Sequence, residues 1–102
     1  MKKTFEIRAF NDERNQWLFV LDNDVLELFS FWDGTSMRCH LAAIDSFEWE
    51  VDRKGRFIHH VIKNHHGRLL LNSLRIWIAP EIEAEARAFS ALVMDAIRKY
   101  TL

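Results

Sequence analysis

The order of hydrophobic patterns along the chain predicts short strands first and one helix at the end. Apolar and polar residues alternate over residues 4–10 and again over residues 46–52, which is typical of strands with one buried face. From Pro80 to about Tyr100, apolar residues instead recur at spacings of three and four, which indicates an amphipathic helix. The chain therefore predicts a sheet-forming region that a single helix closes.

Two apolar runs near the N-terminus predict a hairpin. Residues 17–21 and 25–32 flank the polar residues 22–24, so we expect a three-residue loop that pairs Leu21 with Val25. A helix over residues 25–32 is the competing interpretation, but the aromatics and the flanking turn residues favour a strand. The expected register leaves apolar side chains on both faces, unlike a sheet with one wet face. One of these faces carries Trp17, Phe19, Phe29 and Phe31.

The remaining segments predict further strands joined by tight turns. A bend or single helical turn is expected over residues 41–44, where Ala42 and Ala43 interrupt the alternation. Clusters of polar residues with glycine predict turns over residues 53–55 and 64–67. The strands that we expect between these turns cover residues 36–40, 46–52, 56–63, 68–72 and 74–78.

The closing helix has signals at both ends. Pro80 suits the first helical position, acidic residues follow it, and basic residues end the helix, as its dipole favours. We expect ion pairs between Glu83 and Arg87 and between Asp95 and Lys99, each four residues apart. The stripe expected to face the sheet comprises Ile82, Ala86, Phe89, Val93, Ala96, Ile97 and Tyr100.

Composition narrows the classes of function. The formal net charge is −1 with acids and bases interspersed, so the chain lacks the basic footprint of a nucleic-acid-binding protein. Cys39 is the single cysteine, which excludes an intrachain disulfide and favours a reducing compartment. The N-terminal residues lack the apolar run of a signal peptide, and no apolar stretch matches a membrane span. We therefore expect a cytoplasmic protein.

Histidines and Cys39 are the candidates for chemistry, but their spacing is unfavourable. Structural zinc sites usually contain closely spaced ligand pairs, whereas His59 and His60 would point to opposite faces of one strand. We expect neither a metal nor another cofactor. Catalysis by Cys39 or a serine would need a nearby base and an orienting acid, and no spacing singles these out. We therefore assign no catalytic residue, and an enzyme is the less favoured class.

Two segments resemble the small bacterial pleckstrin-homology-like (PH-like) domains. One is residues 74–81 leading into Glu85 and Phe89, and the other is the bend over residues 40–44 followed by Phe47-Glu48-Trp49. The resemblance implies a mainly β domain of the α+β class over residues 1–102. Its six or seven antiparallel strands would form a barrel or sandwich capped by one C-terminal α-helix.

This resemblance implies a fold that serves many functions. Phosphoinositide-binding PH domains carry a basic motif around their first hairpin loop, whereas residues 11–16 here contain two acids and a single base. We therefore expect no phosphoinositide binding. The favoured function is a non-catalytic binding or assembly module that acts through protein–protein contacts, in a homodimer or with a stable partner. The candidate interface is Trp17, Phe19, Phe29 and Phe31. The alternative is a small enzyme or ligand-binding barrel with a pocket lined by histidine and aromatic residues.

Overall fold

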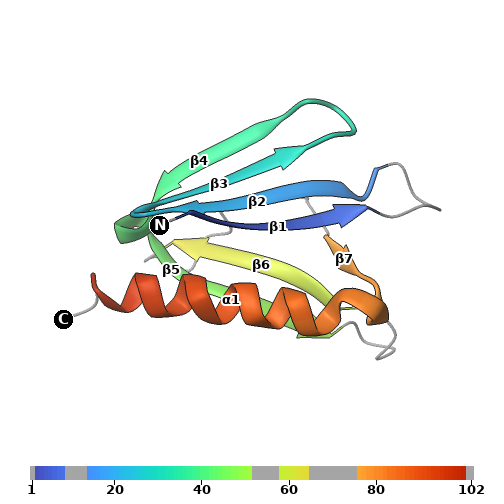
Figure 1. Ribbon diagram of the computed structural model, residues 1–102. Helices are drawn as coiled ribbons and strands as arrows, with labels where there is room; N and C mark the ends of the chain where they lie inside the picture. The colour runs from blue at the N-terminus through green and yellow to red at the C-terminus, as the bar shows by residue number, and fades with distance from the viewer. Residues whose placement is uncertain (1, 9–13, 52–57, 65–75, 101–102) are drawn as a thin grey trace.

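Strands in the first half of the chain pair in sequence order to form a four-stranded antiparallel sheet. The computed structural model describes residues 2–8, 14–51, 58–64 and 76–100. The sheet has the order β1-β2-β3-β4 (Figure 1). Its strands are β1 (Lys2–Arg8), β2 (Gln16–Asp22), β3 (Val25–Ser30) and β4 (Ser36–His40). Phe5 and Ile7 of β1 are buried while their neighbours are exposed, which confirms the alternation expected there.

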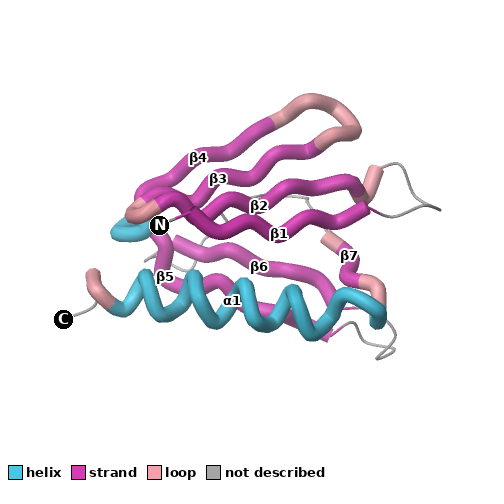
Figure 2. Tube along the Cα trace, viewed as in Figure 1, coloured by secondary structure: helices cyan, strands magenta, loops and turns pink. Residues whose placement is uncertain are grey.

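A second antiparallel sheet follows, with the order β5-β6-β7. The expected bend is a 3-10 turn, η1 (Leu41–Ala43), that leads from β4 into this sheet. Its strands are β5 (Ile44–Val51), β6 (Ile58–Asn64) and β7 (Trp77–Ile78). Figure 2 shows the two sheets as separate groups of strands, and within the described residues no strand pairing joins them.

The C-terminal helix lies along both sheets. A 3-10 turn, η2 (Pro80–Ile82), opens it and α1 (Glu83–Arg98) continues it, as the sequence predicted. The expected ion pair between Glu83 and Arg87 forms at 2.9 Å, whereas Asp95 pairs with Arg98 at 2.7 Å rather than with Lys99. The helix contacts β1 of one sheet and β5 of the other (Figure 1), so it bridges the two layers.

The hairpin register differs by one residue from the sequence expectation, which was wrong. Asp22 belongs to β2 and pairs with Val25, so the loop contains only two residues, Asn23 and Asp24. Asn23 has a φ of 53°, a conformation that asparagine tolerates better than most residues. The strand β3 is therefore shifted by one position relative to β2. Because side chains alternate along a strand, this shift exchanges which β3 residues share a face with those of β2.

Four phenylalanine rings hold the layers together. Phe19 of β2 is fully buried and its ring meets those of Phe5, Phe47 and Phe89 at centroid separations of 5.8, 6.0 and 6.0 Å. Phe89 of α1 also contacts Phe5 and Phe47 at 5.9 and 6.1 Å. One core cluster therefore contains residues of both sheets and of the helix.

The α+β class, the antiparallel sheet and the C-terminal helix are confirmed. A closed barrel of six or seven strands is not shown by the described residues, in which the sheets remain separate. Three expected segments lie wholly or mostly outside the described residues: the turns over residues 53–55 and 64–67 and the strand over residues 68–72. Within the described parts of the chain, no helix is both long and apolar enough to cross a lipid bilayer.

Candidate functional site

The turn between β3 and β4 holds two large aromatic side chains in solvent. Phe31 is 46% exposed and Trp32 is 47% exposed, whereas most large apolar residues of the described chain are buried. Arg8 and Arg14 lie beside these rings, at the same end of the four-stranded sheet. We call these four residues, Phe31, Trp32, Arg8 and Arg14, the aromatic tip.

Hydrogen bonds anchor the backbone of this turn. The Asp33 carboxylate accepts from the Thr35 backbone N–H at 2.9 Å and from its hydroxyl at 2.7 Å, and these bonds hold the pKa of Asp33 below its ordinary value. Ser30 N–H donates to the Thr35 carbonyl at 2.9 Å. Phe31 N–H donates to the Gln16 carbonyl at 2.9 Å, which ties the turn to β2. The exposed rings therefore stand on an anchored backbone.

Each exposed ring carries an arginine over its face. The guanidinium carbon of Arg8 lies 4.4 Å from the centre of the Phe31 ring, and that of Arg14 lies 5.5 Å from the Trp32 ring. Glu6 fixes the first of these arginines, because its carboxylate accepts from Arg8 Nε at 2.8 Å and pairs with Nη2 at 2.6 Å. Cation–π contacts of this kind are favourable even at exposed sites. The aromatic tip thus presents apolar surface beside two guanidinium groups, and the charge of one of them, that of Arg8, is balanced by Glu6.

The sequence-predicted interface does not form one surface. Trp17 and Phe19 are 4% and 0% exposed and belong to the core, so their assignment to an interface was wrong. Their inner-face partners in β3 are Ser30 and Leu28, because of the one-residue register shift. Phe29 lies opposite Leu18 on the outer face, where both are half-buried. Of the four predicted residues, Phe31 alone reaches the exposed tip.

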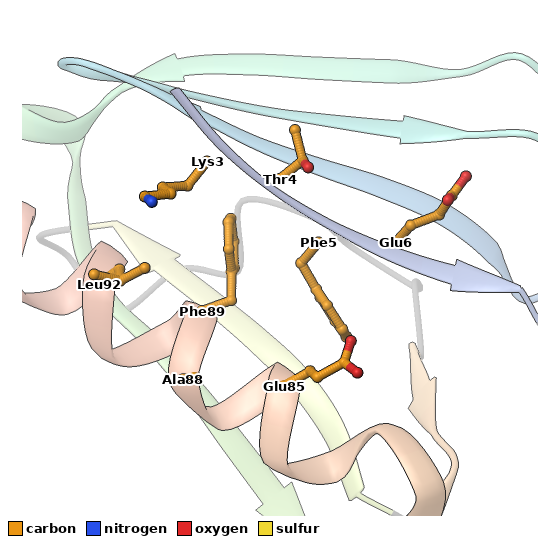
Figure 3. Close-up of a pocket in the computed structure, with 8 residues that line it drawn as sticks. All are labelled: Lys3, Thr4, Phe5, Glu6, Glu85, Ala88, Phe89 and Leu92. Atoms are coloured by element: carbon orange, nitrogen blue, oxygen red, sulfur yellow. The ribbon is translucent and has the colours of Figure 1, made fainter. Parts of the chain in front are cut away.

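A groove runs between β1 and α1. Its volume is about 460 Å³, and Figure 3 shows the helix forming one wall and the strand the other. The buried rings of Phe5 and Phe89 line it, together with Leu92, which is 39% exposed. Charged and polar side chains complete the lining. The eight lining residues are Lys3, Thr4, Phe5, Glu6, Glu85, Ala88, Phe89 and Leu92, which we call the β1–α1 groove.

His40 has a structural role in the described fold. Its Nδ1 accepts a hydrogen bond from the Ala42 backbone N–H at 3.0 Å and so caps the turn η1. Its ring meets Tyr100 edge-on at 5.2 Å, and the hydrogen bond from Tyr100 to Asp24 raises the pKa of the tyrosine. The groove contains no histidine among its described lining residues. The expected pocket of histidine and aromatic side chains therefore gains no support from it.

The other chemical candidates are dispersed. Cys39 is half-buried, and burial raises the pKa of its thiol, which makes it a weaker nucleophile at neutral pH. No cluster of metal-ligating side chains occurs among the residues that the structure describes. His65 and His66 lie outside them, as do the side chains of His59 and His60.

Sequence reasoning missed Trp32, Arg8 and Arg14 as site residues. The available signal was the Phe31-Trp32 pair directly before Asp33-Gly34, since residues at the start of a turn seldom lie in the core.

No protein-family model matches the chain, and neither a curated protein nor a solved structure matches it.

Proposed function

We propose that this chain is a PH-like domain that works as a non-catalytic binding or assembly module through protein contacts. Two features support the proposal: a four-stranded and a three-stranded antiparallel sheet followed by one C-terminal helix, and the aromatic tip. The first agrees with the fold that the sequence resembles. The second supplies a surface with the composition of a protein-binding site.

The aromatic tip is the single observation that carries this function. Trp, Tyr and Arg are the residues that contribute most to protein interfaces, particularly when they are held in place before binding. Trp32 and Phe31 are exposed and stacked by arginines, and the turn beneath them is hydrogen-bonded. Because Trp17 and Phe19 are buried in the core, the interface that we propose is the tip and not those two residues. A cytoplasmic location stays part of the proposal and rests on the lone thiol of Cys39.

A photo-cross-linking experiment tests this function. The variant Trp32→p-benzoylphenylalanine is produced in cells and irradiated, and any protein joined to it is identified by mass spectrometry. We expect cross-links to one defined protein, which can be a second copy of this chain. The matched control, Lys99→p-benzoylphenylalanine, places the same probe at an exposed position beyond the end of α1 and should not capture that protein. If position 32 captures nothing above this control, the tip is not a protein-binding surface.

A further inference from the structure

We propose that the β1–α1 groove binds an extended peptide segment of another protein, which adds to the free edge of β1 as a further antiparallel strand. The segment carries an apolar residue at its centre, a basic residue two positions before it and an acidic residue two positions after it. Three features of the groove carry the inference: the backbone of β1, the apolar floor and the charges at the two ends. The rings of the aromatic tip take no part, so the inference is independent of the function proposed above.

Backbone groups of β1 face away from the sheet at every second residue. Among the described residues, β1 is an edge strand that pairs with β2 alone. The Gln16 carbonyl accepts from Phe31 N–H, so the backbone groups of Gln16 face β3. Gln16 lies opposite Arg8, and successive residues of a strand direct their N–H and C=O groups to alternate sides. The backbone groups of Glu6 and Thr4, two and four positions before Arg8, therefore face away from β2.

This free edge opens onto the groove. Thr4 and Glu6 line the groove, yet Figure 3 shows their side chains directed away from the helix, so they present backbone to it. All the lining residues belong to β1 or α1, and no other described segment fills the space. Unpaired edge groups are a template for another extended chain, which adds through main-chain hydrogen bonds. A helical partner satisfies its own backbone groups and cannot pair with them.

The floor of the groove determines the central residue of the segment. Every strand pairing among the described residues is antiparallel, and directly opposite residues of such a pair share a face. The residue opposite Phe5 therefore directs its side chain as Phe5 does, toward Phe89 and Leu92 (Figure 3). A groove of about 460 Å³ can admit a phenylalanine side chain, which would cover the exposed part of Leu92.

The charges at the two ends determine the orientation of the segment. Figure 3 shows Lys3 toward one end of the groove and Glu85 toward the other. Lys3 precedes Phe5 by two positions, so in an antiparallel segment it faces the residue two positions after the apolar one. An acidic residue there complements Lys3, and a basic residue at the other end complements Glu85. Glu6 makes no such contact, because it is paired with Arg8.

Amide exchange measured by NMR tests the pairing, with the synthetic peptide acetyl-Thr-Lys-Thr-Phe-Thr-Glu-Thr-amide as the probe. In the free protein, the amides of Thr4 and Glu6 should exchange with solvent faster than that of Phe5, which faces β2. Millimolar peptide should slow exchange at Thr4 and Glu6 at least about threefold and leave Phe5 unchanged. Absence of binding at this concentration, or binding without this alternate protection, overturns the inference.

Methylated peptides test whether the contact uses the backbone. A methyl group on the nitrogen of the threonine on either side of the phenylalanine removes an N–H that faces β1, so it should weaken binding at least about tenfold. A methyl group on the phenylalanine nitrogen, whose N–H faces away from β1, is the matched control and should have a smaller effect. Equal affinities for the two kinds of peptide would overturn the pairing.

Variants of the protein test the floor and the charges. Leu92→Asp should weaken binding about tenfold, whereas Ala91→Asp, an exposed position outside the groove, should behave like the wild type. The wild type should bind the probe about threefold more tightly than the peptide with its lysine and glutamate exchanged, and Lys3→Glu combined with Glu85→Lys should reverse this preference. Trp32→Ser should leave the affinity unchanged. Equal effects at positions 91 and 92, an unreversed preference, or loss of binding in Trp32→Ser would each contradict the proposed site.

Discussion

Phe89 is the side chain whose truncation should most clearly test the packing of the helix against both sheets. It is 4% exposed and its ring lies within 5.9–6.1 Å, between centroids, of Phe5, Phe19 and Phe47. Truncation of a buried phenylalanine to alanine costs about 3–5 kcal/mol of unfolding free energy. The cavity would open where two sheets and the helix meet, so the neighbouring rings cannot all move to fill it. We expect Phe89→Ala to lose about 4 kcal/mol.

The assay is urea unfolding followed by circular dichroism, which gives the free energy of unfolding and its dependence on urea. The control is Leu92→Ala on the same helix, where the side chain is 39% exposed and we expect a loss below about 1 kcal/mol. A domain of ordinary stability, about 5–15 kcal/mol, can remain folded after the Phe89 change. If it does not, Phe89→Leu supplies a milder comparison. Equal losses for the Phe89 and Leu92 variants would refute the packing argument.

Three further predictions concern other parts of the chain. Asn23→Ala should lose about 1 kcal/mol of unfolding free energy, because the φ of residue 23 is 53° and alanine adopts this conformation less readily than asparagine. Asn23→Gly should lose less, and equal urea midpoints for the two variants would show that the turn conformation has no energetic cost for alanine. Hydrogen bonds from Thr35 lower the pKa of Asp33 in the folded protein, so the ionised carboxylate stabilises the fold above about pH 3.8, and this stabilisation is lost as the pH falls through the pKa of the folded state. Asp33→Asn should therefore reduce the dependence of the unfolding free energy on pH in acid. Burial raises the pKa of the Cys39 thiol, so at neutral pH it should react with a disulfide reagent more slowly in the folded than in the urea-unfolded protein, and identical rates would count against its burial.

The candidate site was only partly predictable from the pattern of residues. The excess of aromatic residues in the hairpin indicates that some of them lie on an exposed surface, and Phe31 does. The sequence places Trp17 and Phe19 on the same surface because it predicts a three-residue loop, whereas the loop contains two residues. The two loop lengths fit the same alternation, and they differ only in which β3 residues face the core. The arginines of the tip come from the end of β1 and from the residues just before β2, far from the rings in sequence, so no local pattern could connect them with the rings.

Local patterns alone determined the elements of this protein. Alternation over β1 and β5 and the three-and-four spacing over α1 depend on neighbouring residues, and the structure has these elements within a few residues of the expected bounds. Tertiary structure decided the hairpin register, because the two-residue loop lets Phe19 and Leu28 share one buried face beneath the helix. Tertiary structure also created the groove, because the groove forms only where α1 packs beside β1. Both depend on contacts between residues far apart in the chain, and the period of a strand or helix contains no information about those contacts.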